Sequence, residues 1–195
     1  GPGVDRSGDV LRHANMAGTS PHGGVLVIAG DDHSGESSTV VHASDIALTD
    51  AMIPVLSPAG VQEIIDFGLI GFDLSRYAGV WVGLKCIHDT VESSAVVEAG
   101  SDRIATVTPR DHKLPPDGLH IRPSDDRVPQ EERLHIHKVP AVLAFTRANG
   151  INRIVMQGGK APKLGIVAPG KSYLDVRQAL DDLGIDEMQA SKLGI

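Results

Sequence analysis

The stretch G-V-L-V-I-A-G, residues 24–30, decides the fold. Five consecutive apolar residues lie between two glycines, and no polar residue alternates with them. A strand that is buried on both faces has this pattern, and such strands are typical of parallel sheets with helices on each side. The stretch therefore predicts a buried strand in an α/β domain.

Two further apolar runs, at 52–56 and 80–87, predict strands of the same parallel sheet. Between them, Ser57 and Pro58 predict the cap and first position of a helix over 58–76. A strand–helix–strand unit of this spacing is a right-handed crossover. Its helix carries one apolar stripe, which we expect to cover one face of the sheet: Val61, Ile64, Ile65, Leu69 and Phe72.

The other face of the sheet needs cover as well, because the apolar runs do not alternate. We expect this cover from helical segments at 10–17 and 41–50. An open edge should remain on the sheet, and an open edge favours pairing with another copy or another chain. We therefore expect a homo-oligomer.

The second half of the chain has a different composition. Residues 98–130 contain five prolines and many charges, which predicts a long connection with short extended pieces at 104–107 and 119–122. A helix is expected over 131–148, and Pro140 must start, kink or interrupt it. A strand is expected at 151–156.

The last predicted unit is a strand at 164–168 followed by a helix over 172–183, which Ser172 would cap. Its sequence G-I-V-A-P-G-K-S, residues 165–172, fits the spelling of a phosphate-binding P-loop. A P-loop follows a buried strand, but here the apolar residues lie inside the motif and Gly158-Gly159 precedes it. We expect no nucleotide binding.

Composition narrows the function classes. The net charge of −7 does not favour a nucleic-acid partner. Cys86 is the only cysteine, so a disulfide within the chain and a four-cysteine iron–sulfur cluster are both excluded. We expect no membrane span and a cytoplasmic protein.

The most function-like segment follows the strand at 24–30. Open α/β sheets bind ligands at the carboxyl ends of their strands, and the polar loop begins there. Its candidate residues face a cleft or form an ordinary solvated turn, and the sequence leaves both readings open: Asp31, Asp32, His33, Ser34, Ser37 and Ser38. Two alternatives follow from the residues alone. One is a stand-alone α/β binding module, and the other is a small metal-dependent hydrolase that uses Asp31, Asp32 and His33.

Several long stretches, in order, resemble the indolepyruvate ferredoxin oxidoreductases, in their long fused bacterial form. These stretches are G-P-G-V-D-R-S-G-D-V at 1–10, H-A-N-M-A-G-T-S-P-H-G-G-V at 13–25, G-D-D-H-S-G-E-S-S-T at 30–39, I-P-V-L-S-P-A-G-V-Q-E at 53–63, L-S-R-Y-A-G-V-W-V-G-L-K at 74–85, D-T-V-E-S-S at 89–94 and G-K-S-Y-L-D-V-R-Q-A-L-D-D-L-G-I-D at 170–186.

The resemblance implies an internal fragment of a larger enzyme. Residues 1–97 are similar to the later half of a three-layer, parallel-sheet pyrimidine-binding domain of thiamine diphosphate enzymes. Residues 163–195 are similar to the start of a transketolase C-terminal-like α/β unit, and 98–162 join the two.

The resemblance also implies an activity for the whole enzyme. Such enzymes oxidatively decarboxylate aryl pyruvates to acyl-CoA and reduce ferredoxin, using thiamine diphosphate, Mg²⁺ and 4Fe–4S clusters. The glutamate that contacts the aminopyrimidine is expected before residue 1, and the diphosphate site in another domain. The partners implied are the remaining domains, ferredoxin and coenzyme A. We expect no catalytic residue, metal or bound cofactor in the 195 residues, which should be inactive alone.

Overall fold

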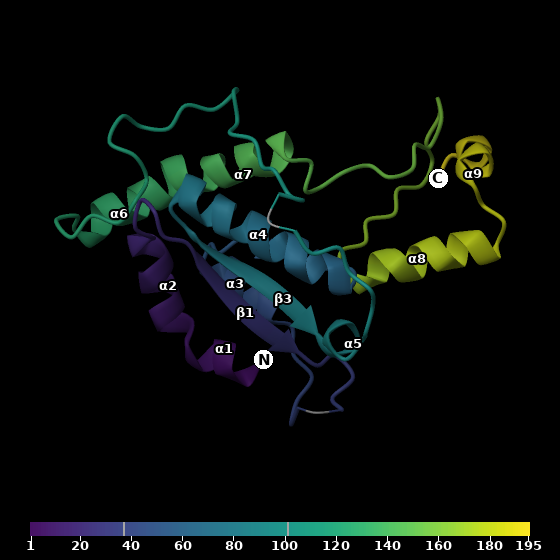
Figure 1. Cartoon of the computed structure of the whole chain (residues 1–195), viewed down its shortest axis with the longest axis horizontal. Helices are drawn as coiled ribbons and strands as arrows, with labels where there is room; N and C mark the ends of the chain where they lie inside the picture. Colours follow the sequence, from purple (N-terminus) through teal and green to yellow (C-terminus); the bar gives the residue numbers. More distant parts are fainter. Residues whose placement is uncertain (37, 101) are drawn as a thin grey trace.

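A parallel sheet organises the first half of the chain (Figure 1). The computed structural model describes residues 1–36, 38–100 and 102–195. Within them, β1 (Val25–Asp31), β2 (Val55–Leu56) and β3 (Trp81–Ile87) form one sheet in the order β1-β3-β2. β1 pairs with β3 along its whole length, and β2 pairs with β3. The α/β class and the shared parallel sheet are thus confirmed.

Helices cover both faces of this sheet. α3 (Ser44–Asp50) connects β1 to β2, and α4 (Val61–Ala78) connects β2 back to β3, which lies between them. Because the two crossovers run in opposite directions across the sheet, right-handed connections place their helices on opposite faces.

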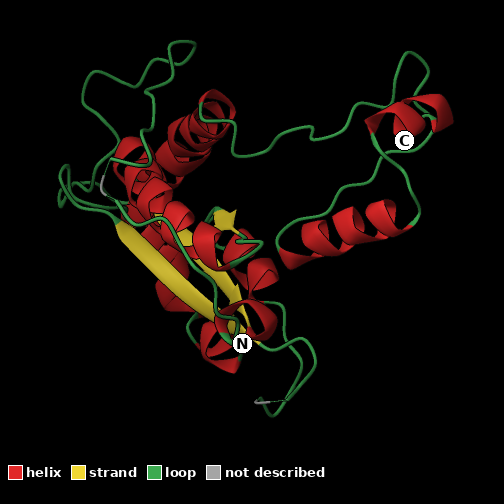
Figure 2. Cartoon of the chain, turned by 45° about the vertical axis from the view of Figure 1, so that its right-hand side comes forward, coloured by secondary structure: helices red, strands yellow, loops and turns green. Residues whose placement is uncertain are grey.

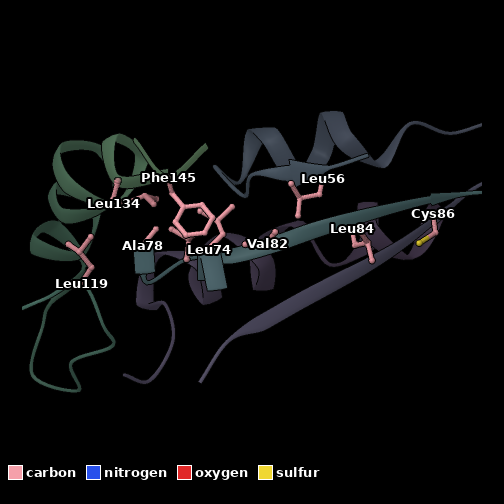
Figure 3. Close-up of a cluster of buried hydrophobic side chains, with 11 residues drawn as sticks. Leu56, Leu74, Ala78, Val82, Leu84, Cys86, Leu119, Leu134 and Phe145 are labelled. Atoms are coloured by element: carbon pink, nitrogen blue, oxygen red, sulfur yellow. The ribbon is translucent and has the colours of Figure 1, made fainter. Parts of the chain in front are cut away.

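Two hydrophobic clusters correspond to the two faces. The α4 face holds the larger cluster, which Figure 3 shows and which includes Leu74, Val82 and Phe145. The α3 face holds a second cluster, with Leu11, Ala29 and Leu48. Two glycines allow the close approach of the helices, because a Cβ at Gly71 would lie 2.5 Å from Leu26 and one at Gly83 would lie 2.8 Å from Leu48.

The N-terminal helices α1 (Pro2–Arg6) and α2 (Gly8–Ala17) lie on the α3 side. Leu11 of α2 belongs to the second cluster. Asn15 is fully buried: its amide nitrogen donates to the carbonyls of Ala51 and Met52, and its amide oxygen accepts from the backbone N–H of Trp81 at 2.9 Å. The expected cover from 10–17 and 41–50 is therefore confirmed.

The predicted helix over 58–76 is present, but its start is shifted. α4 begins at Val61 after Gly60, so Ser57 is not its cap and Pro58 is not its first residue. Glu63 accepts a hydrogen bond from the backbone N–H of Ala59 at 2.7 Å, which orders the entry to the helix without a serine cap. The strand predicted at 52–56 is reduced to β2, because α3 ends in a turn at Met52.

The middle of the chain packs helices against α4. After α5 (His88–Val91) and a long connection come α6 (Arg127–Arg133), the π-helix η1 (Leu134–Lys138) and α7 (Val139–Ala148). Pro140 stands in the first turn of α7, directly after η1. A π-turn is one way for a helical path to continue past a residue that lacks an N–H. The extended pieces at 104–107 and 119–122 form no strands in the described ranges.

The C-terminal segment lies to one side of the sheet (Figures 1 and 2). α8 (Lys171–Asp182) confirms the predicted helix, but Gly170 precedes it and Ser172 is not the cap. The predictions of strands at 151–156 and 164–168 are wrong. Neither segment pairs with a strand in the described structure, and Val167 is 96% exposed. A short α9 (Glu187–Leu193) follows. None of the helices in the described ranges combines the length and apolarity that crossing a bilayer requires.

Candidate functional site

Asp31, the last residue of β1, is a buried anchor for the next helix. Its side chain is fully buried and accepts hydrogen bonds from both the backbone N–H (2.8 Å) and the hydroxyl of Ser44. Ser44 is the first residue of α3. The carboxylate therefore fixes where α3 starts, near the carboxyl end of β1.

A cation completes this arrangement. Lys85 of β3 places its ammonium 3.9 Å from Asp31 and 3.0 Å from Asp45, and its side chain is only 13% exposed. Burial would raise the pKa of Asp45, but the hydrogen bond and charge of Lys85 outweigh burial and lower it. Two carboxylates thus share one ammonium at the carboxyl ends of β1 and β3.

Asp32 has a different task, because it organises the loop itself. Its carboxylate accepts from the Ser34 hydroxyl at 3.2 Å, from the N–H of Gly35 at 2.8 Å and from the N–H of Ser38 at 2.9 Å. Such bonds from an aspartate to the following backbone are typical of polar turns. For Asp32 and Ser38, the structure favours the turn reading that the sequence left open.

The remaining candidates lie at the tip of this loop. His33 and Ser34 are exposed, whereas Ser37 lies outside the described residues. His88 of α5 contacts Glu36 at 3.1 Å, which ties the loop to the carboxyl end of β3. Among the candidate residues that the structure describes, His33 and Ser34 present exposed side chains to a partner, and the loop that carries them is held by Asp32 and by the His88–Glu36 contact.

These contacts do not favour a metal-dependent hydrolase. Asp31 and Asp32 direct their oxygens to Ser44 and to the loop backbone. In residues 1–36, 38–100 and 102–195, no three His, Cys, Asp or Glu side chains are grouped to hold a metal ion. The site proposed from Asp31, Asp32 and His33 thus lacks a suitable arrangement of ligands.

The carboxyl end of β2 meets the start of α8. A Cβ at Gly170 would lie 2.5 Å from the Ser57 hydroxyl, so Gly170 packs closely against the Ser57 side chain. Lys171, the lysine of the P-loop spelling, pairs instead with Asp175 at 2.9 Å, and this hydrogen bond raises its pKa. The segment before it follows no strand in the described structure, so the geometry is that of a helix start and not of a P-loop.

Sequence reasoning missed Lys85, Ser44 and Asp45 as members of the site. A signal was available for Lys85: it is the one charged residue in the apolar run at 80–87, and a buried charge requires a partner. No comparable signal identifies Ser44, because serine is common at helix starts.

Comparisons of the sequence with a family model and with individual proteins give the same kind of enzyme. Residues 154–195 match the indolepyruvate oxidoreductase domain. The indolepyruvate oxidoreductase subunit IorA of Methanothermobacter thermautotrophicus is 30% identical over 180 residues, which cover 92% of this chain and 28% of that protein. The subunit IorA of Pyrococcus abyssi is 30% identical over 183 residues, 89% of this chain and 27% of that protein.

The subunit IorA of Methanothermobacter marburgensis is 28% identical over 180 residues, again 92% of this chain. The chain spans only about 28% of the length of these relatives. No solved structure matches it significantly. The domain match at the C-terminal end and the IorA similarity along nearly the whole length both relate the chain to the indolepyruvate oxidoreductases.

Proposed function

We propose that this chain is an internal segment of a thiamine diphosphate-dependent oxidoreductase that decarboxylates aryl pyruvates to acyl-CoA and reduces ferredoxin. The observation that carries the proposal is the similarity to IorA subunits over 92% of the chain but 28% of their length. In this reading, residues 1–97 are the later half of a pyrimidine-type domain, 98–162 a connection, and 163–195 the start of a transketolase C-terminal-like domain.

Within the whole enzyme, we assign a positioning role to the carboxyl end of the sheet. Ligands of open α/β sheets bind beyond this end, where β1 and β3 terminate. Asp31, Ser44 and Lys85 form a buried network there that fixes the start of α3 beside the loop that follows β1. His33 and Ser34 would face the cleft, and neither receives a catalytic role.

The residues of this chain do not fit the cofactors of such an enzyme. Magnesium diphosphate is usually held by one or two carboxylates, and the two carboxylates at the end of β1 already bind Ser44, Lys85 and the backbone of the loop. A 4Fe–4S cluster needs four thiolates, and the chain has one cysteine, the buried Cys86. Other parts of the enzyme would have to supply both sites, so we derive no catalytic step from these residues.

The test compares the 195-residue chain with the complete enzyme. The complete protein, with its partner domains, should reduce ferredoxin in a reaction that requires both indolepyruvate and coenzyme A. The 195-residue chain should show no heat of binding when titrated calorimetrically with thiamine diphosphate and Mg²⁺. Micromolar binding by the chain would contradict the domain assignment, and a complete enzyme without coenzyme A-dependent turnover would contradict the proposed activity.

The loop assignment has its own test in the complete enzyme. His33→Ala should raise KM for the 2-oxo acid with little loss of thermal stability, because the side chain is exposed. His13→Ala is the matched control, since His13 is exposed on α2, away from this loop. If the two variants have the same KM for the 2-oxo acid, the loop does not line the cleft.

A further inference from the structure

A short segment of the connection between α5 and α6, residues 118–122, closes over the amino end of the sheet. Leu119 is 1% exposed and belongs to the cluster on the α4 face (Figure 3). It packs so closely on Gly79, just before β3, that a Cβ there would lie 2.1 Å from its carbonyl oxygen. The N–H of Ile121 donates to the carbonyl of Thr19, before β1, at 2.9 Å. The segment is therefore held at two points.

His120 lies between these two points, and one of its ring nitrogens is enclosed. Nδ1 is buried and has no hydrogen-bond partner among the described residues. A neutral imidazole fits this position, because its proton can be on Nε2 while Nδ1 carries none. A second proton would have to bind Nδ1, and a buried donor of a charged group without an acceptor is costly. The closed segment therefore favours neutral His120 on geometric grounds.

The charges around His120 act in the same direction. Three basic groups from three parts of the chain face it: His22 after α2, Arg122 in the same segment and Lys138 in η1. Burial is the largest cause that lowers the pKa of His120, and these charges lower it further. From α4, Asp73 and Arg76 line the same hollow as His120 but pair with each other at 3.3 Å. Tyr77 of α4 also lines it and stays neutral, because burial raises its pKa above 10.

We propose that His120 makes 118–122 an acid-sensitive latch over the amino end of the sheet. Near neutral pH, the neutral imidazole allows the segment to lie closed on Gly79 and Thr19. When the pH falls, protonation is coupled to opening, because only the open segment exposes Nδ1 to water. Opening breaks the Ile121–Thr19 hydrogen bond and uncovers Leu119. The proposal stands on the enclosed nitrogen and the two contacts beside it, and it does not depend on the proposed function.

The sign and the size of the effect follow from proton linkage. A histidine whose pKa is lowered in the closed state stabilises that state fully above its ordinary value of 6.5, and this stabilisation is lost as the pH falls. Because one proton is taken up, the ratio of open to closed segment rises by up to about ten-fold for each pH unit. The hydrogen bond from Arg122 lowers the pKa of Asp117 below 3.8, so that carboxylate titrates in a separate range.

Amide hydrogen exchange of the 195-residue chain, followed by NMR between pH 7.5 and 5.5, measures the opening. After correction for the intrinsic pH dependence of exchange, the Ile121 amide should lose protection by roughly three- to ten-fold as the pH falls from 6.5 to 5.5. The Ile53 amide, which donates to Leu48 on the α3 side at 2.9 Å, is the internal reference. It should keep its protection, because the latch opens locally.

Substitution and titration complete the test. His120→Gln has no group that titrates in this range, so the protection of its Ile121 amide should not depend on pH. His13→Gln is the matched control on exposed α2 surface and should behave as the wild type does. The ring signals of His120 in the wild type give a measurement that needs no variant, and they should titrate below 6.5. Constant Ile121 protection in the wild type, the same loss in His120→Gln, or a His120 ring that titrates at 6.5 or above overturns the proposal.

Discussion

Lys138 offers the sharpest test of how the two halves of the described chain hold together. Its side chain is fully buried at the end of η1, and its ammonium donates to the carbonyls of Met16 (3.0 Å) and Ala17 (3.4 Å). These carbonyls are at the C-terminus of α2, where helices leave carbonyls unpaired and favour a cation. Lys138 thus links the N-terminal helix to the helices that follow residue 126.

The cost of this link is the burial of a charge. Burial, with the charge of Arg133, lowers the pKa of Lys138 from 10.5 to about 8. The unfolded chain therefore binds more protons than the folded chain between pH 8 and 10.5, and the free energy of unfolding rises with pH in that window. At about 1.4 kcal/mol per pKa unit, raising the pH from 7 to 9.5 should stabilise the fold by about 2 kcal/mol through this group.

Lys138→Met isolates the effect. At pH 7 the variant loses two hydrogen bonds, which destabilises it, and also loses a buried charge, which stabilises it. The change in its free energy of unfolding at a single pH is therefore not informative. The pH dependence is decisive, because the variant has no group to titrate. The wild type should gain about 2 kcal/mol relative to Lys138→Met between pH 7 and 9.5.

Urea denaturation followed by fluorescence measures this difference. Trp81 is the only tryptophan, and its indole N–H donates to the carbonyl of Gly18, next to the end of α2. Lys113→Met, at an exposed position, is the control and should follow the wild type. If the wild type and Lys138→Met keep a constant difference across this pH range, Lys138 is not a charge buried at a depressed pKa.

Three further predictions concern backbone, motif and sheet edge. Gly79→Ala should lower stability by more than about 1 kcal/mol in thermal unfolding, because Gly79 has φ +64° and a Cβ would lie 2.1 Å from the carbonyl oxygen of Leu119; Gly68→Ala, in open space within α4, should raise stability by about 0.5–1 kcal/mol. Mg-ATP should not shift the melting temperature, and Lys171→Ala should not alter that result; a shift that the substitution removes would restore the P-loop reading. The chain should self-associate through the edge of β1, burying on the order of 1,000 Å² or more, and Ile28→Lys, on an exposed side chain of that strand, should weaken this in sedimentation equilibrium; a monomer at high concentration would refute it.

The sheet was predictable because its signal is local and strong. The apolar runs at 24–30 and 80–87 became β1 and β3 with a shift of one residue, since glycines and polar residues bound each run. The start of α4 was less predictable: a Ser-Pro pair is a good helix signal, yet a side-chain bond from Glu63 to Ala59 allowed the helix to begin later. The π-helix before Pro140 has no signal in residue spacing; it lies directly before a proline in α7, which packs on α4.

The candidate site stays a prediction, and the contacts within it were only partly predictable from the sequence. Its position after β1 followed from topology, which a single buried strand already suggests. The different roles of Asp31 and Asp32 could not be predicted from the sequence. Adjacent residues at the end of a strand point in opposite directions, and only Asp31 faces α3. Lys85 comes from a strand more than fifty residues away in sequence, so its approach to Asp31 depends on the sheet order.

The strands predicted at 151–156 and 164–168 are absent from the described structure for a different physical reason. A run of apolar β-branched residues predicts that a segment could be a strand, but a strand exists only when another backbone pairs with it. Leu164, Ile166 and Val167 have no such partner in the described structure and remain about half exposed or more, which costs the hydrophobic stabilisation that the pattern implies. The same segment lies within the match to the indolepyruvate oxidoreductase domain. Its apolar pattern is therefore consistent with packing against parts of a larger enzyme.

In such an enzyme we expect 164–168 to become a strand while α8 keeps its present ends. The helix is stabilised by its own Lys171–Asp175 pair, whereas the strand needs a pairing strand from elsewhere. Hydrogen exchange would show protection at 164–168 in the complete enzyme and none in the 195-residue chain; equal exchange in both would mean that the segment is a loop in either setting.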